Sequence, residues 1–316
     1  MLRWLLIFVL ALIPLGGFMY WRMHEFTAPV ENIYVPLKAP MPKTDIDLDG
    51  AQEHLSQALQ FKTIADVDGS PRDPAAFLSF ETWLTSAYPA IASAATVERI
   101  ADYSLLYTWA GSDPNAAPIL IIGHLDVASV EGGGEFSGVL RNGSVWGRGA
   151  QIGKGPLISI LEAANALAAS GFKPKRTVIL AFGHDGDVRG EAGAAQIAKV
   201  LKARGVKAWF GVDEGPPVAA NNALTNRPSV LLALTEKREL NLIVRSESPP
   251  GAASIRRQQA VTNVAQALVA LDAMPNSASL TDEPTADMLR ALAPEMPASR
   301  AFVIANSWLF EPLILF

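Results

Sequence analysis

The segment Pro118-Ile-Leu-Ile-Ile-Gly-His-Leu-Asp126 decides the fold, because an apolar run leads directly into a histidine and an acid. Two later segments have the same form. Thr177–Phe182 leads into Gly-His-Asp-Gly-Asp, and Ala208–Val212 leads into Asp-Glu-Gly. Short apolar runs of this kind, bounded by glycine and polar residues, are typical of buried strands. We therefore predict three strands, each ending in side chains that can do chemistry.

Helical patterns separate these predicted strands. Apolar residues recur at helical spacing over residues 156–170, and a second helix is predicted over residues 191–204. This alternation predicts an α/β fold with a largely parallel sheet flanked by helices. In such sheets the functional residues gather at the carboxyl ends of strands, so we expect the three polar segments to converge on one edge.

A smaller unit is predicted after the sheet. Leu240, Leu242 and Val244 alternate with polar residues, which is typical of a half-buried strand, and helices are predicted over residues 255–271 and around 286–292. These elements predict an incomplete α+β domain. The predicted divisions of the chain are residues 1–22, 23–50, 51–229 and 230–316.

The first division holds an uncharged run from Trp4 to Trp21, which is long enough to cross a bilayer as a helix. A cleaved signal peptide is the competing interpretation, but the run is long for one and has no small-residue cleavage site. We expect a single-pass transmembrane anchor followed by a proline-rich tether. Arg3 favours a cytoplasmic amino terminus, so the globular part is expected outside the cytoplasm.

The composition narrows the function. The chain has 316 residues, of which 50% are hydrophobic, so it can bury a core. A formal net charge of −5 without a basic stripe argues against nucleic acid as a partner. There is no cysteine to supply thiolate ligands, and only four histidines (His24, His54, His124 and His184) limit any metal site.

A histidine and carboxylates from neighbouring strand ends are the usual components of a catalytic zinc site, with one more carboxylate free to act as base. Each residue also has a structural interpretation when it is taken alone. His124 can be a hydrogen-bonded core histidine, and Asp213 can cap the turn that follows it. The convergence of several such residues on one edge favours the metal site.

These motifs resemble those of a family of di-zinc hydrolases, peptidase family M20, which includes aminoacylase, acetylornithine deacetylase and carboxypeptidase S. The likeness is greatest to the membrane-anchored carboxypeptidase S branch and covers roughly Glu53 to Phe316. The segments that carry it are residues 118–127, 136–138, 147–150, 182–187, 212–215, 236–237 and 306–313. The resemblance implies that residues 51–229 form an incomplete zinc-peptidase-like catalytic domain and residues 230–316 a partial lid or dimerisation domain.

Four residues match positions that the resemblance assigns to the metal site. His124 and Asp213 stand at ligand positions, and Asp187 stands where the family has a glutamate ligand. Asp126 matches the carboxylate that orients the metal-binding histidine. Three protein ligands and a water are a recognised catalytic pattern, so a single-metal site from His124, Asp187 and Asp213 is possible.

Other positions depart from the family pattern. The loop Gly147–Gly155 reads G-R-G-A-Q-I-G-K-G, whereas the family has G-R-G-x-x-D-D-K with the first aspartate bridging two zinc ions. Ile152 stands at the bridging position and Gly153 at the second aspartate. Gly186 stands at the general base, and the family's last histidine ligand lies in a C-terminal segment that the chain lacks. We therefore expect a truncated chain with impaired or absent catalysis.

Three functions stay open at this point. The favoured one is a membrane-anchored pseudoenzyme that binds a peptide-like or N-acyl amino-acid ligand, or a protein partner that covers its apolar C-terminal residues. The alternative is an active single-metal hydrolase of peptide or N-acyl amino-acid bonds, with Asp185 or Glu214 as base. The third is a truncated relic. One weakly held zinc ion and no metal at all are equally compatible with the sequence.

Overall fold

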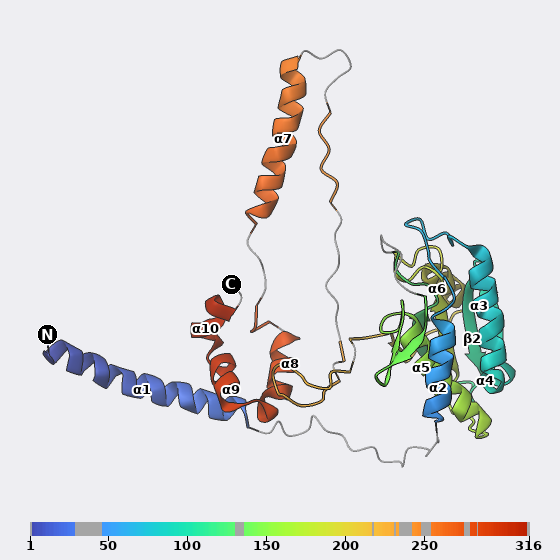
Figure 1. Cartoon of the computed structure of the whole chain (residues 1–316). Coiled ribbons are helices and arrows are strands. Elements are labelled where there is room, and N and C mark those ends of the chain that lie inside the picture. The colour runs from blue at the N-terminus through green and yellow to red at the C-terminus, as the bar shows by residue number, and fades with distance from the viewer. Residues whose placement is uncertain are drawn as a thin grey trace. The chain divides into compact units, whose positions relative to one another are not determined.

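The computed structural model describes residues 2–28, 46–129, 136–216, 218–230, 232–233, 242–247, 254–274, 279–282 and 284–314. The chain forms two compact units (Figure 1). One unit is Leu37–Pro217, and the other combines Met1–Pro36 with Val218–Phe316. Residues 29–45, most of the predicted tether, lie outside the described residues. The four predicted divisions of the chain stay predictions.

The first unit contains a five-stranded sheet in the order β1-β2-β6-β3-β7. Its strands are β1 (Thr96–Ile100), β2 (Ser104–Trp109), β3 (Ile119–His124), β6 (Val178–Gly183) and β7 (Phe210–Val212). β3 pairs in parallel with β6 and β7, whereas β2 pairs antiparallel with both β1 and β6. The predicted α/β sheet flanked by helices is confirmed, but the prediction that it is largely parallel is wrong.

The antiparallel pairing of β1 with β2 has a local cause. β1 and β2 are joined by a tight turn in which Ala101 and Asp102 have φ values of 47° and 67°, so the chain reverses within a few residues. A second hairpin lies outside this sheet and joins β4 (Val139–Arg141) to β5 (Ser144–Trp146). Asn142 and Gly143 form its turn with φ values of 53° and 72°, as an Asn-Gly pair favours.

Helices cover both faces of the sheet. They are α2 (Leu48–Ala58), α3 (Pro74–Ala87), α4 (Pro89–Ala94), α5 (Lys154–Ala169) and α6 (Ala194–Ala203). Because side chains alternate along a strand, Leu180 and Phe182 of β6 pack with α2 to α5, whereas Ile179 and Ala181 pack with α6. A strand buried on both faces reads as a continuous apolar run, which is why the sequence predicts β3 and β6 correctly.

The helices predicted over 156–170 and 191–204 form as α5 and α6. α6 begins only at Ala194, because the residues before it are held by a buried side chain that follows β6. The Asp185 carboxylate accepts hydrogen bonds from the main-chain N–H groups of Ala192 (2.7 Å) and Gly193 (2.9 Å). This contact fixes the entry to α6.

The second unit is helical in its described residues. Its helices are α1 (Leu2–Phe26), α7 (Ser254–Asp272), α8 (Thr285–Leu292), the short 3-10 helix η1 (Ala293–Glu295), α9 (Ala298–Ala305) and α10 (Ser307–Ile314). The predicted helices 255–271 and 286–292 correspond to α7 and α8. Residues 234–241 lie outside the description, and Leu242 and Val244 are exposed and form no strand. The predicted α+β character is therefore not seen in the described part of this unit.

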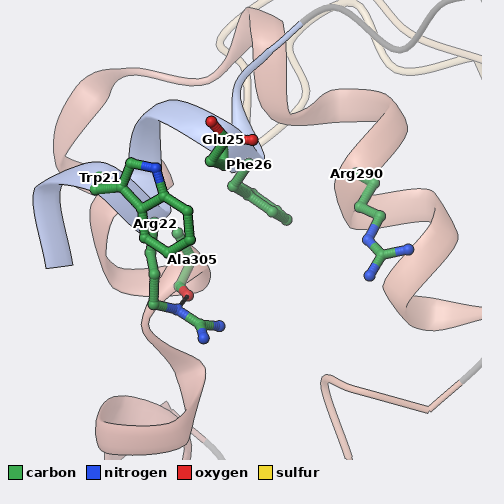
Figure 2. A pocket seen from close by; sticks show the side chains of 6 residues that line it. All are labelled: Trp21, Arg22, Glu25, Phe26, Arg290 and Ala305. Carbon is green, nitrogen blue, oxygen red and sulfur yellow. Dashed lines mark hydrogen bonds between the residues drawn. The ribbon is translucent and has the colours of Figure 1, made fainter. Parts of the chain in front are cut away.

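The end of α1 packs within the second unit. The Arg22 Nε donates a hydrogen bond to the carbonyl of Ala305 (3.0 Å), and the Asn306 amide donates to the carbonyl of Met19 (3.2 Å). Figure 2 shows Arg22 and its neighbours Trp21 and Phe26 beside Ala305 in a pocket on this unit. The helix therefore ends in tertiary contacts with α9.

Among the helices of the described residues, none is both long enough and apolar enough to cross a bilayer. The transmembrane anchor predicted over residues 1–22 is thus not supported. The helix that forms there contains Pro14, and beyond Trp21 it continues into a polar last turn with Arg22 and Glu25.

The apolar residues Trp308 and Leu313 of α10 are 51% and 77% exposed, and a partner that covers them stays a prediction.

Replacing Asp185 by alanine is expected to destabilise the first unit. The carboxylate is fully buried, and its loss leaves two main-chain N–H groups without their acceptor, at a cost of about 1–3 kcal/mol for each. Urea unfolding of the full chain should show a lower midpoint. Asp68→Ala is the matched control, because Asp68 is exposed and its carboxylate accepts hydrogen bonds from Ser70 alone among the described residues. Equal midpoints for the two variants would contradict this role of Asp185.

Candidate metal centre

The three polar segments meet at one edge of the sheet. β3 is hydrogen-bonded to β6 on one side and to β7 on the other, with His124 opposite Gly183 and Ile121 opposite Val212. Because these three strands are parallel, the residues that follow them emerge on the same side. The structure thus brings together the segments that follow β3, β6 and β7.

Asp126 is the most constrained side chain of this edge. It is fully buried, and His124 Nδ1 lies 3.0 Å from its Oδ1. The same carboxylate accepts hydrogen bonds from the main-chain N–H groups of Gly186 (2.8 Å) and Asp187 (3.0 Å). Both of its oxygens are therefore occupied by contacts with His124 and with the loop after β6, and its role as the carboxylate that orients a metal-binding histidine stays a prediction.

His124 is 6% exposed and has a carboxylate at each ring nitrogen. Its Nε2 lies 2.9 Å from Oε1 of Glu214, whose other oxygen accepts a hydrogen bond from the Gly153 N–H (3.3 Å). Burial alone would lower the pKa of His124, but the hydrogen bonds to Asp126 and Glu214 outweigh it and raise this pKa to about 10. The hydrogen bond from His124 in turn lowers the pKa of Glu214.

Asp187 completes a group that can hold a metal ion. His124, Asp126 and Asp187 each offer one ligand atom, and these atoms lie within 4.8 Å of one another. Burial raises the pKa of Asp187, His124 opposes this, and the carboxylates of Asp126 and Glu214 raise it further. A cation at this point would relieve the repulsion between the carboxylates, and one imidazole with carboxylate oxygens is a donor set that suits a divalent ion such as zinc.

Two acids predicted from the sequence lie elsewhere. Asp213 is exposed and outside the group of three, and its carboxylate accepts a hydrogen bond from the Glu214 N–H (2.8 Å). Asp185 is held by the start of α6 and has no contact with His124 among the described residues. The structure therefore places Glu214 at His124 in the position where Asp213 was expected, and a ligand role for Asp213 stays a prediction.

Two glycines pack against the His124 ring. A Cβ atom at Gly186 would lie 2.5 Å from the Cβ of His124, and a Cβ atom at Gly153 would lie 2.9 Å from its Cε1. Gly153 also has a φ of +84°, which disfavours any side chain. The positions that the resemblance assigns to a general base and to the second aspartate therefore have no room for a side chain. Ile152, next to Gly153, is 60% exposed.

A buried lysine next to this loop was not anticipated from the sequence. Lys154 is fully buried, and its Nζ donates to the carbonyls of Ala58 (2.9 Å) and Phe61 and lies 4.8 Å from the centre of the Phe80 ring. Burial lowers its pKa to about 7, which the Asp126 carboxylate partly opposes. Lys154 matches the lysine of the family loop G-R-G-x-x-D-D-K, but that motif does not indicate that the side chain is buried.

The family follows from sequence comparison. Residues 120–302 match the model of "Peptidase family M20/M25/M40", so the chain belongs to this family of peptidases. It is 32% identical over 272 residues to "N-fatty-acyl-amino acid synthase/hydrolase PM20D1" of Mus musculus, an alignment with 83% of this chain and 54% of the mouse protein. The chain spans about half the length of the curated relatives that it matches.

Two further proteins are similar. "Probable carboxypeptidase S-like 2" of Dictyostelium discoideum is 32% identical over 282 residues, which are 86% of this chain and 53% of that protein. The solved structure of the M20 family metallo-carboxypeptidase Sso-CP2 from Sulfolobus solfataricus aligns with 53% of this chain and 38% of its own, at 18% identity and a TM-score of 0.42. The family match and the sequence identities to the mouse and Dictyostelium proteins confirm, at the level of the family, the resemblance read from the motifs.

The contact between Glu214 and His124 is expected to stabilise the metal-free protein by an amount that depends on pH. The His124 pKa rises on folding from 6.5 to about 10, so the folded protein keeps a proton that the unfolded chain releases between these values. The resulting stabilisation is complete below about pH 6.5 and is lost as the pH rises through about 10. The difference in unfolding free energy between the parent and Glu214→Gln should therefore be larger at pH 7 than at pH 10.5.

This difference should be measured with a chelator present. Comparing two variants at each pH cancels other titrating groups, in particular Lys154, whose lowered pKa makes an opposite contribution in the same range. Glu98→Gln is the matched control, because Glu98 pairs with Arg204, which keeps its charge throughout. A Glu214 effect that is equal at both pH values would show that His124 does not hold the extra proton.

Proposed function

We propose that this chain is a metal-binding member of its peptidase family that binds peptide-like or N-acyl amino-acid ligands at a single ion, with little or no hydrolysis. The observation that carries the proposal is the packing of Gly153 and Gly186 against His124. Three positions that hold carboxylates in the family pattern are Ile152, Gly153 and Gly186 in this chain. A second ion would have no bridging ligand, and the base position has no group that can move a proton.

The residues that would hold the ion are His124 through Nε2, Asp187, and a carboxylate from Asp213 or Glu214. Because Asp126 contacts Nδ1, an ion would bind at Nε2, where it would replace the proton that is shared with Glu214. When bound, a divalent ion polarises a substrate carbonyl or lowers the pKa of a water molecule. General acid–base catalysis contributes about 10²- to 10⁴-fold, so Gly186 alone supports a large loss of rate.

An active single-metal hydrolase is the second candidate, and one observation favours it. Glu214 lies at His124 with a lowered pKa, so it is an ionised carboxylate within the site and is able to accept a proton. Asp185 is a weaker candidate for this role, because two main-chain N–H groups at the start of α6 occupy its oxygens. The choice between the two functions therefore depends on what Glu214 does.

Zinc content tests the metal site. We expect about one zinc per purified full-length chain, and a large loss in Asp187→Ala, because Asp187 is one of few carboxylates within reach of His124. Asp66→Ala is the control, since the Asp66 side chain is 44% exposed and pairs with Arg72. Comparing Asp213→Ala with Glu214→Ala identifies the third ligand. Two zinc ions per chain, or none, would contradict the single-ion site.

Hydrolysis of an N-acyl phenylalanine distinguishes the two candidate functions. With zinc bound, we expect the parent to be slower than the similar mouse protein by at least the factor of about 10²–10⁴ that a general base contributes. Glu214→Gln should then change this low rate little. If instead the parent is active, and Glu214→Gln lowers kcat by about 10²-fold or more while its zinc content is unchanged, Glu214 is the base and the protein is a single-metal hydrolase.

A further inference from the structure

A pocket of about 400 Å³ lies beside the metal centre and shares Asp187 with it. Its other main side chains are Val127, Val145, Trp146, Arg148, Gln151 and Ile152. A volume of this size suits a small molecule, and a mostly apolar wall with a few polar groups is usual for such sites. The pocket therefore has the chemistry of a ligand site, and nothing in the metal centre accounts for its apolar wall.

Trp146 is held in place without being covered. Its indole N–H donates to the carbonyl of Arg141 (3.3 Å), and the Arg141 guanidinium lies 4.9 Å from the ring centre. The residue ends β5, and it is still 52% exposed. A rigid aromatic side chain offers contact area to a ligand with little loss of conformational entropy.

Ile152 is presented on a turn with a fixed shape. Gly149 and Gly153 flank it with φ values of +89° and +84°, and a Cβ atom at Gly149 would lie 2.6 Å from Val127. The backbone of the turn is thus packed closely, whereas the isoleucine side chain is 60% exposed. An isoleucine and a tryptophan that line one pocket from ordered positions form an apolar wall about the size of a short acyl chain or an aromatic side chain.

The same pocket is also lined by a positively charged side chain, that of Arg148. The Arg148 guanidinium donates to the Ala128 carbonyl (2.7 Å) and lies 5.3 Å from the centre of the Phe136 ring, so it is also held in place. Among the described residues the Arg148 guanidinium makes this one hydrogen bond, although it has five N–H donors. Guanidinium groups bind carboxylates in a bidentate way. The pocket therefore suits a molecule that has both an apolar group and a carboxylate.

We propose that Ile152 and Trp146 form a subsite for the apolar acyl group of an N-acyl amino acid, and that Ile152 determines its preference for apolar over small acyl groups. Arg148 binds the carboxylate of the same ligand. This inference rests on the proposed function, because it names the ligand of that site. The preference for apolar acyl groups has a separate physical cause from the metal site. Ile152 and Trp146 are not metal ligands, so their contact with an acyl group does not require an ion.

The test compares two probes, N-octanoyl-phenylalanine and N-acetyl-phenylalanine, by calorimetry on the full chain, once with zinc and once with a chelator. We expect the octanoyl compound to bind about tenfold tighter or more in both conditions, because each buried methylene adds to affinity. Ile152→Asn and Trp146→Ala should each reduce this ratio several-fold. Arg148→Leu should weaken both probes equally and leave the ratio unchanged.

Leu140→Asn is the matched control, because Leu140 is 58% exposed on the neighbouring strand β4 and does not line the pocket. The inference is overturned if the two probes bind equally, if neither binds, or if Leu140→Asn lowers the ratio as much as Ile152→Asn does. A chain that binds no zinc but keeps the octanoyl preference contradicts the metal centre alone. A chain that binds one zinc without this preference contradicts the subsite alone.

Discussion

The carboxylate of Asp126 is the constraint on which the edge of the sheet depends. It accepts one hydrogen bond from the His124 ring and two from the main chain after β6, so it ties together two loops that follow neighbouring parallel strands. An ionised carboxylate that is buried in a protein must be compensated by hydrogen bonds or by opposite charge. The positions of Gly186 and Asp187 are thus a consequence of satisfying Asp126, and the orientation of His124 is another.

A buried lysine, Lys154, also interacts electrostatically with Asp126, although among the described residues it makes no hydrogen bond to an acid. Lys154 is fully buried at the start of α5, where main-chain carbonyls and the Phe80 ring surround its ammonium group. One carbonyl belongs to Ala58, the last residue of α2, and the other to Phe61 just beyond it, so the lysine connects α5 with α2 on one face of the sheet. The loop that presents Ile152 is held between this anchorage and the contact of Gly153 with Glu214.

The sequence predicts well where periodicity and burial agree. β3, β6, α5 and α6 are recognisable because their apolar residues follow the spacing of a buried strand or of an amphipathic helix. The hairpin of β1 and β2 was missed, since its turn uses Ala101 and Asp102 in the left-handed region instead of a glycine or asparagine signal. The antiparallel pairing of β1 with β2 follows from that turn, whereas the antiparallel pairing of β2 with β6 does not depend on it.

The sequence predicted which types of residue gather at the candidate site, but it did not predict which acid contacts His124. His124, Asp126 and Asp187 were recognisable because each follows a predicted strand. Asp213 and Glu214 are adjacent acids, and which of them reaches His124 depends on the backbone at the end of β7, which spacing along the chain cannot reveal. Contacts such as that of Arg22 with Ala305, between residues far apart in the sequence, are invisible to local patterns for the same reason.

The packing of Gly153 and Gly186 around His124 limits which side chains can be introduced here one at a time. The imidazole lies in the space that a side chain at either position would need, and its contact with Glu214 holds it there. A single substitution at Gly153 or Gly186 would bring a Cβ atom within 3 Å of the His124 side chain, so the ring would have to move as well. Placing a carboxylate at either position therefore requires a second change that gives the imidazole another place to lie.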